Sequence, residues 1–224
     1  MTERRDLVLL SGGMDSTTAL ARRMREGTAR LCVSVHYGQR HVRELRAAAG
    51  VAAHYDLPHL VLDLSSWGAL LTGSALTDSS VEVPHGHYAA PTMSITVVPN
   101  RNATLLMAAA GIAQSRGLTH VVAAMHAGDH PIYPDCRPEF LDALDRALGL
   151  ATENRVSLDA PFTTCDKTEI ARQARALSAP LHLTWSCYEG GAIHCGRCGT
   201  CVERREAFQR AGVDDPTVYA ARAA

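Results

Sequence analysis

The chain has 224 residues, of which 46% are hydrophobic and 20% charged, the composition of an ordinary globular protein rather than a fibrous or disordered one. Its 22 basic and 23 acidic residues give a net charge of −1, so we expect no basic surface that holds nucleic acid by its phosphates. No apolar run is long enough for a signal peptide or a membrane span. We therefore expect a cytoplasmic protein that binds neither nucleic acid nor membranes.

Short β-rich runs alternate with segments of helical periodicity. Strands are predicted at Asp6–Leu10, Leu31–Tyr37, His59–Leu64, Thr119–Met125 and near Val156–Ala160. Helices are predicted at Asp15–Glu26, Arg43–His54, Asn102–Arg116, Pro138–Leu150 and after a capping box made by Asp166 and Glu169. This alternation predicts a doubly wound, Rossmann-like α/β domain with a parallel sheet, whose ligands bind beyond the carboxyl ends of the strands.

Two long segments do not fit the alternation. Ser65–Arg101 contains prolines, glycines and a His-Gly-His triplet, and Met125–Arg137 is rich in His, Asp and Pro. Loops of this length inside a compact domain are usually functional or disordered.

The segment SGGMDS, Ser11–Ser16, follows the first predicted strand and opens the first helix. Glycines let the backbone approach an anion, and the amides at a helix start point toward it. The candidate phosphate-binding residues are Ser11, Gly12, Gly13, Met14, Asp15, Ser16 and Thr17. Asp15 could hold Mg²⁺ between phosphates. The alternative is a plain tight turn between strand and helix.

This segment is not a Walker P-loop, because no Gly-Lys-Ser/Thr ends it. It resembles the SGGxDS loop of the PP-loop ATP pyrophosphatases. The resemblance implies that the loop binds the pyrophosphate of ATP while a substrate oxygen attacks the α-phosphorus. Transfer of AMP, rather than of the γ-phosphoryl group, is then the activating step.

Four of the seven cysteines are spaced C-x7-C-x2-C-x2-C: Cys187, Cys195, Cys198 and Cys201. Four thiolates at such spacing can enclose one tetrahedral Zn²⁺, and a site with four protein ligands is structural rather than catalytic. The alternatives are an iron–sulfur cluster and a site in which His194 replaces one thiolate. The remaining cysteines, Cys32, Cys136 and Cys165, are expected to pack in the interior.

Four further strings complete the motif set: YGQRH from Tyr37, VPNRN from Val98, YPDCRPEF from Tyr133 and TWSCY from Thr184. Together with SGGMDSTT and CGRCGTC, in this order, they resemble the QueC family of 7-cyano-7-deazaguanine synthases. The resemblance extends over nearly the whole chain. It implies a PP-loop domain over residues 1–180 with a small zinc-binding helical region at 181–224 packed on it.

The resemblance implies a ligase that converts 7-carboxy-7-deazaguanine and ammonia to a nitrile, with ATP, Mg²⁺ and structural Zn²⁺. The carboxylate is adenylated, ammonia displaces AMP to give an amide, and the amide oxygen is activated again and eliminated. A homodimer is also implied. Adenylation is physically reasonable because a carboxylate is a poor electrophile that needs a leaving group.

Individual roles follow from the same resemblance. Asp15, Lys167 and Arg101 are the expected catalytic residues; Lys167 would steady phosphate charge and Arg101 could bind a carboxylate or phosphate bidentately. The alternative for Lys167 is a solvated surface lysine without a role. The alternative for Arg101 and Asn102 is an ordinary pair of residues at a helix start. Substrate contacts are expected from Tyr37, Gln39, Arg40, Asn102, Asp129, Asp135 and Arg137.

Before YPDCR the chain reads Gly128–Ile132, GDHPI, where many QueC relatives have an Asp-aromatic-Ser-Gly run. The alternative function is therefore a QueC-like enzyme that stops at the amide or uses it in a modification or defence pathway. His126 and His130, beside Asp129, could shuttle protons. Less favoured are a tRNA thiolase or lysidine synthetase, which needs additional RNA-binding surface, and a non-enzymatic zinc-knuckle module.

Overall fold

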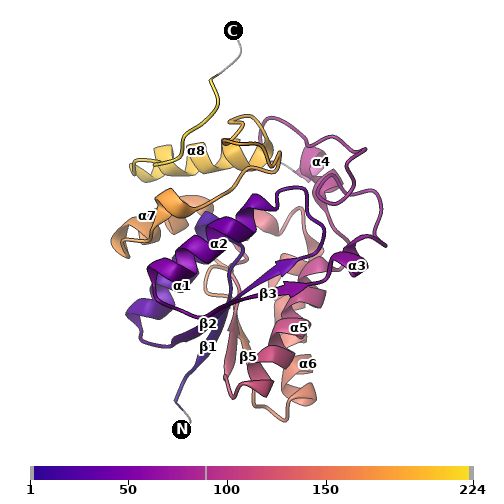
Figure 1. The fold of residues 1–224 in the computed structure, drawn as a ribbon, viewed down its shortest axis with the longest axis vertical. Coiled ribbons are helices and arrows are strands. Elements are labelled where there is room, and N and C mark those ends of the chain that lie inside the picture. The colour runs from indigo at the N-terminus through magenta and orange to yellow at the C-terminus, as the bar shows by residue number, and fades with distance from the viewer. Residues whose placement is uncertain (1–2, 89, 222–224) are drawn as a thin grey trace.

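A five-stranded parallel sheet forms the centre of the molecule, which a computed structural model describes for residues 3–88 and 90–221 (Figure 1). The strands are β1 Asp6–Leu9, β2 Ala29–His36, β3 His59–Asp63, β4 His120–Val122 and β5 Ser157–Asp159. Their order across the sheet is β3-β2-β1-β4-β5, and every neighbouring pair is parallel. The predicted doubly wound α/β class is confirmed.

Six longer helices surround the sheet: α1 Met14–Arg25, α2 Arg43–His54, α5 Arg101–Ser115, α6 Pro138–Ala151, α7 Lys167–Ala176 and α8 Gly199–Ala211. Short turns of helix lie in the two long segments and before the cysteines: α3 Ser65–Gly68, α4 Ala90–Met93, η1 Ser94–Thr96, η2 Ala127–Asp129, η3 Pro134–Cys136 and η4 Leu181–Leu183. Among the described helices, none combines the length and apolar character that crossing a bilayer requires.

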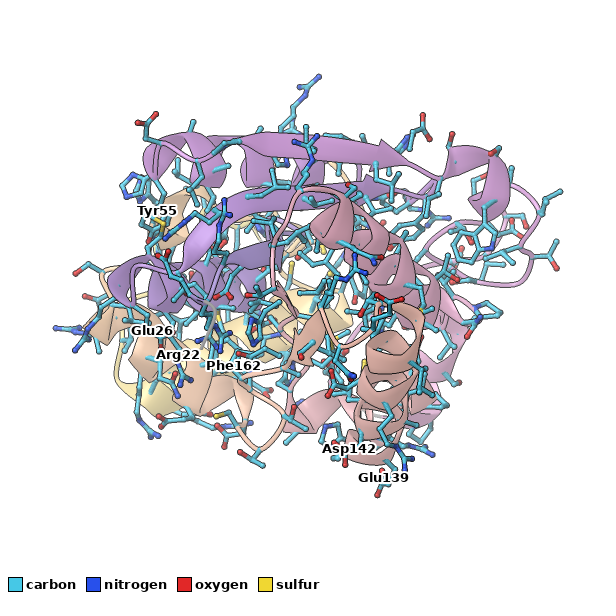
Figure 2. The ribbon with its side chains drawn as sticks, turned by 90° about the horizontal axis from the view of Figure 1, so that it is seen from below. Arg22, Glu26, Tyr55, Glu139, Asp142 and Phe162 are labelled. Atoms are coloured by element: carbon cyan, nitrogen blue, oxygen red, sulfur yellow. The ribbon has the colours of Figure 1, made fainter. Side chains whose placement is uncertain are left out.

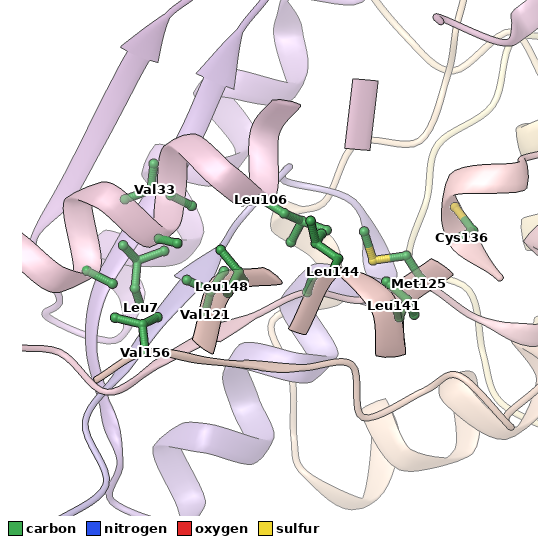
Figure 3. Packing of buried hydrophobic residues seen from close by; sticks show 14 of the residues in the cluster. Leu7, Val33, Leu106, Val121, Met125, Cys136, Leu141, Leu144, Leu148 and Val156 are labelled. Carbon is green, nitrogen blue, oxygen red and sulfur yellow. The ribbon is translucent and has the colours of Figure 1, made fainter. Parts of the chain in front are cut away.

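The alternation of side chains along the strands makes two hydrophobic cores. Leu7, Val33 and Val121 face one side, where they pack with residues of α5 and α6 (Figure 3). Their strand neighbours, including Val8 and Val122, face the other side, toward α1, α2, α7 and α8. Because both faces are covered, the central strands are apolar throughout.

Charged side chains occupy the outer faces of the covering helices. Glu139 and Asp142 point outward from α6, while Arg22 and Glu26 form a 3.1 Å ion pair on α1 (Figure 2). These helices are therefore amphipathic, with an apolar face on the sheet and a charged face in solvent.

The topology changes direction at β1. From β1 the chain first builds β2 and β3 on one side, and then crosses to build β4 and β5 on the other. In a parallel sheet such a reversal leaves a crevice beyond the carboxyl ends of the two central strands. SGGMDS follows β1 into this crevice, and the segment from Met125 follows β4.

Two local predictions differ from the structure. The predicted strand Thr119–Met125 pairs only over His120–Val122, because the chain then leaves the sheet toward η2. The capping box at α7 is only half formed. The Asp166 carboxylate accepts from the Glu169 backbone N–H at 2.7 Å, but the Glu169 side chain accepts from Gln173 Nε2 at 3.3 Å rather than from the Asp166 backbone N–H.

Gly12 is required by packing against α2. Its φ is +86°, and a Cβ at this position would lie 2.2 Å from the Glu44 carbonyl oxygen and 2.8 Å from the Ala48 nitrogen. Both obstacles are backbone atoms, so neither can turn away. The first glycine of SGGMDS therefore lets the loop lie against a helix.

We predict that Gly12→Ala lowers the free energy of unfolding by about 2 kcal/mol or more, from overpacking plus backbone strain. For a chain of this size that is a fall in Tm of roughly 4–8 °C. Gly27→Ala is the matched control, since Gly27 also has a positive φ of +72° but no atom within 4 Å of the added Cβ. Thermal unfolding measures both variants, and equal losses would contradict the packing argument.

Candidate functional site

A cavity of about 260 Å³ lies beyond the carboxyl ends of β1 and β4. Its walls come from the loop before α1, the end of β2, the starts of α5 and α7, η2, and the segment from Trp185 to Glu203. The C-terminal region therefore lines the same cavity as the sheet domain.

The SGGMDS loop forms one end of the cavity. The Ser11 and Ser16 hydroxyl oxygens lie 3.0 Å apart, and the Gly13 N–H donates to the Ser11 oxygen at 3.3 Å. Gly13 is the N-cap of α1 and supplies no side chain to the amides of the first turn, so these remain available to an anion. Of the seven candidate phosphate-binding residues, Gly12 and Thr17 lie outside the lining; Thr17 is fully buried.

Asp15 and Lys167 form an ion pair across this end of the cavity. The Lys167 Nζ donates to Asp15 Oδ2 at 2.8 Å, although 152 residues separate the two in the chain. Burial alone would raise the pKa of Asp15, but the attraction of Lys167 and His126 outweighs it and holds that pKa below its usual value. Burial likewise opposes the charge of Lys167, and Asp15 and Glu203 together raise its pKa.

The second carboxylate oxygen of Asp15, Oδ1, is buried and has no hydrogen-bond partner among the described residues. A buried carboxylate oxygen without a donor is costly unless a cation or a ligand completes it. The donor set at this end, a free carboxylate oxygen beside serine hydroxyls, consists of the hard oxygen ligands that Mg²⁺ prefers.

Two side chains that the sequence did not assign to this end also approach Lys167. Glu203 Oε2 lies 3.3 Å from the Lys167 Nζ, and His126 Nε2 lies at 3.3 Å as well. The Gly128 N–H donates to the other ring nitrogen of His126 at 3.1 Å, which fixes the ring. Burial raises the pKa of Glu203 despite the nearby Lys167. None of the motif strings points to Glu203 as a site residue. The direction of its side chain depends on the rotation of α8, which the local sequence does not reveal.

Arg101 and four tyrosines form the other end of the cavity. The guanidinium lies 5.9 Å from the ring centroids of both Tyr37 and Tyr133, and its Nη1 is 3.5 Å from the Tyr37 hydroxyl. Tyr88 and Tyr188 complete the group, so four of the six tyrosines of the chain line this one cavity. Burial raises the pKa of Tyr37 to about 12, which keeps its hydroxyl protonated.

Across the described part of the chain, no carboxylate lies within ion-pair distance of Arg101. Asp129, which the sequence predicted as a substrate contact, lies beside these tyrosines but does not pair with Arg101. It accepts from the Tyr88 hydroxyl at 3.1 Å instead. A half-buried cation without a counter-charge favours an anionic ligand, and a guanidinium suits a planar carboxylate in particular.

The four predicted cysteines come together beside the cavity. The Sγ atoms of Cys187, Cys195, Cys198 and Cys201 all lie within 4.8 Å of one another. Backbone N–H groups of Cys195 and Cys198 donate to the sulfurs of Cys187 and Cys195, each at 3.3 Å. These four residues, called the cysteine cluster below, form a group that can bind a metal ion.

His194 is not a member of the cysteine cluster. Its Nε2 accepts from the Ser186 N–H at 3.1 Å, and its ring lies against Trp185 at a tilt of 37°, with the centroids 4.2 Å apart. The cluster instead contacts the long segment 65–101, whose Val83 is buried together with three of the four cysteines and whose His85 forms an isolated β-bridge with Cys198.

Comparison with known proteins agrees with this geometry. The sequence model of the family described as "Queuosine biosynthesis protein QueC" matches residues 5–212. The chain belongs to the QueC family. A protein of Allorhizobium ampelinum named 7-cyano-7-deazaguanine synthase is 51% identical over 95% of this chain and 91% of its own length. A protein of Brucella anthropi with the same name is 49% identical over 95% and 92%.

Among solved structures, NMN synthetase from Francisella tularensis has a similar fold, with a TM-score of 0.50 and 12% identity over 84% of this chain and 68% of that one. At this identity the likeness concerns the fold alone.

Several QueC motif residues lie outside the cavity because their polar atoms are used within the protein. Gln39 turns back, so that its Oε1 accepts from the Tyr37 N–H at 2.8 Å. Arg40 donates from Nη2 to the carbonyls of Asp78 and Val81, at 3.0 and 2.9 Å, and thereby holds the segment after α3. Neither side chain lines the cavity.

The YPDCR string behaves similarly. Asp135 accepts from the Asn102 N–H at 2.8 Å and from Asn102 Nδ2 at 3.1 Å, so it caps α5 rather than facing a ligand. Arg137 is exposed and donates to the His130 carbonyl at 3.0 Å. Asn102 does line the cavity, and so does His126, but His130 does not.

Cys198→Ser should lower the bound-metal content and the Tm together, since a closed metal site contributes folding free energy. Metal analysis by mass spectrometry and thermal unfolding measure the two. Cys165→Ser is the control, because the half-buried Cys165 lies outside the cysteine cluster, at the edge of the hydrophobic core, and its sulfur has a 3.9 Å contact with Gln173 Nε2. If Cys198→Ser kept its metal, or lost it with an unchanged Tm, the structural role would be wrong.

Proposed function

We propose that this QueC protein is a 7-cyano-7-deazaguanine synthase: an ATP-dependent ligase that makes the nitrile from 7-carboxy-7-deazaguanine and ammonia in queuosine biosynthesis. The family match and the names of relatives about 50% identical support the assignment. The observation that carries it is the division of one cavity into two ends. One end is an anion-binding loop with Lys167 and Asp15, and the other is an arginine among tyrosines that has no carboxylate within ion-pair distance in the described residues.

The loop end is suited to the pyrophosphate of ATP. The first-turn amides of α1 and the hydroxyls of Ser11 and Ser16 would donate to phosphate oxygens. Lys167 would neutralise the charge that leaves with pyrophosphate. The free Oδ1 of Asp15 and the neighbouring hydroxyls would hold Mg²⁺, which supplies further charge neutralisation when bound.

The tyrosine end is suited to the deazaguanine. Tyrosine rings bury a planar heterocycle through their faces and keep a hydroxyl for its polar edge. Arg101 would bind the carboxylate bidentately and turn one oxygen toward the loop end. This arrangement places the attacking oxygen and the α-phosphorus in one cavity, where proximity lowers the barrier.

The chemistry then runs through two activations. A carboxylate oxygen attacks the α-phosphorus and pyrophosphate leaves; ammonia displaces AMP and gives the amide. The amide oxygen attacks a second ATP in the same way, and loss of AMP and the remaining N–H protons gives the nitrile. Both activated species are prone to hydrolysis, so the reaction needs water to be kept from them once the substrates are bound.

For the cysteine cluster we propose structural Zn²⁺. Four sulfurs about 2.3 Å from one tetrahedral ion lie roughly 3.8 Å apart, and a single ion therefore fits a group confined within 4.8 Å. An iron–sulfur cluster divides the four thiolates between two or four irons and needs a wider cage.

Other parts of the proposal concern the whole molecule. We propose a PP-loop domain over residues 1–180 with region 181–224 packed on it, a cytoplasmic homodimer, and small-molecule substrates without nucleic acid. Packing of α8 against α7 supports the arrangement of the two regions (Figure 1).

An enzyme that stops at the amide is the second candidate. Asp129, in the string Gly128–Ile132 where the chain departs from the usual QueC sequence, lines the cavity, and so does His126 shortly before it. A change in this loop therefore lies next to the reacting groups and bears on how far the reaction proceeds.

The test is a mass-spectrometric assay with 7-carboxy-7-deazaguanine, ATP, Mg²⁺ and ammonium. We expect the nitrile and AMP. Asp15→Asn, which keeps the shape but removes the charge facing Lys167, should lower turnover at least about a hundredfold while the fold and metal content survive. Accumulation of the amide alone would favour the second candidate, and no consumption of either substrate by folded protein would contradict the proposed function.

Arg101→Gln should raise the KM for the carboxylate substrate at least about tenfold, since one charged bidentate contact is lost, and leave the KM for ATP within about twofold. Steady-state kinetics with each substrate varied in turn measures both. Arg137→Gln is the matched control, because Arg137 is exposed and lies outside the cavity, and it should change neither constant. A larger effect on ATP than on the carboxylate substrate would reverse the assignment of the two ends.

A further inference from the structure

The ammonium group of Lys167 lies between two carboxylates that come from opposite ends of the chain. Asp15 Oδ2 on α1 is 2.8 Å away and Glu203 Oε2 on α8 is 3.3 Å away. All three side chains are mostly buried, with 15% to 21% of each exposed, and all three line the cavity. The ammonium is therefore attracted by two carboxylates, in addition to its 3.3 Å contact with His126 Nε2.

Glu203 is held in place by rigid neighbours. The N-cap of α8 is Cys198, and Cys201 lies in its first turn, so the cysteine cluster fixes where the helix begins. The next residue, Arg204, is fully buried and donates to Thr184 Oγ1 at 2.8 Å and to Ser186 Oγ at 3.1 Å. These contacts fix the rotation of α8, and that rotation turns Glu203 toward the cavity.

Removal of one of two carboxylates would move the lysine. A long, flexible side chain that loses one partner closes on those that remain, here Asp15 and His126, because an uncompensated buried charge is costly. Without Glu203, the Lys167 ammonium would close on Asp15. There it would cover the carboxylate and be less available to a phosphate bound at the loop.

We propose that Glu203 is a positioning residue that keeps the Lys167 ammonium from closing on Asp15, and that the cysteine cluster acts on the reaction through this contact. The inference rests on the proposed function in that Lys167 serves the phosphates. It assigns to the cluster a role beyond stability: it anchors the helix that carries the second partner of the lysine.

Lys167 is the only lysine among the 22 basic residues, which allows a direct test. Protein grown with lysine labelled with ¹³C at Cε gives one lysine NMR signal. In Glu203→Gln we expect that signal to differ from wild type in position and line width, because the ammonium has lost one partner. We also expect exchange of labelled pyrophosphate into ATP, dependent on 7-carboxy-7-deazaguanine and without ammonia, to have kcat/KM for ATP at least tenfold lower.

The control is Glu206→Gln, one turn along α8. Glu206 Oε2 accepts from Arg210 at 2.9 Å, and the residue does not line the cavity. This variant should match wild type in both measurements. Metal content and Tm of every variant show whether the cysteine cluster and the fold are intact. Glu203→Asp keeps the charge one methylene farther away, so it should recover part of the exchange rate, and it serves as the informative variant if Glu203→Gln does not fold.

The outcomes separate the two proposals. An unchanged lysine signal in Glu203→Gln would overturn the positioning role, whether or not exchange fell, because Glu203 would then not act through Lys167. A changed signal with unchanged exchange would overturn it as well, since the position of the lysine would not matter to the reaction. Failure of the wild-type protein to exchange pyrophosphate would count against the proposed function instead, and the lysine signal would still decide the contact.

Discussion

The position of β1 between β2 and β4 is the constraint on which the rest of the structure depends. Because the chain builds outward from β1 in both directions, the loops after β1 and β4 diverge and leave space at the carboxyl edge of the sheet. SGGMDS and the His126–Asp129 segment then face each other across this space. Lys167 reaches it from α7, which follows the edge strand β5, and pairs with Asp15 at 2.8 Å. The topology thus brings together residues that the sequence keeps far apart.

The C-terminal region is part of the same site rather than an attachment to it. Trp185 donates its backbone N–H to the Gly12 carbonyl at 2.8 Å, so the segment before the cysteine cluster is hydrogen-bonded to the phosphate-binding loop itself. On the far side of the cluster, Glu203 reaches Lys167. The cluster therefore lies between two segments that both contact the loop end of the cavity. A change in the cluster would reach the cavity through both.

The alternation of strands and helices was sufficient to predict the fold, because parallel strands buried on both faces leave a plain apolar pattern. It also predicted SGGMDS at the cavity, since any loop after a central strand must lie there. It could not predict which side chain of a loop faces inward. Tyr37 faces the cavity, whereas Gln39, two residues later, turns back to accept from the Tyr37 N–H. Asp135 likewise caps α5, a contact that only the tertiary structure creates. Glu203 depends on the rotation of α8, which the burial of Arg204 determines and no local pattern reveals.

The two cations of the cavity differ in a way that matches their surroundings. A guanidinium is planar and presents pairs of donors, which suits the carboxylate of a flat substrate between tyrosine rings; Arg101 occupies such a place. An ammonium is a compact charge whose donors point in three directions, and Lys167 has carboxylates on two sides. Arginine serves at every other basic position that is not histidine, including the buried ion pairs of Arg23 and Arg204. The one lysine thus stands where a compact point charge lies near two carboxylates beside the phosphate-binding loop.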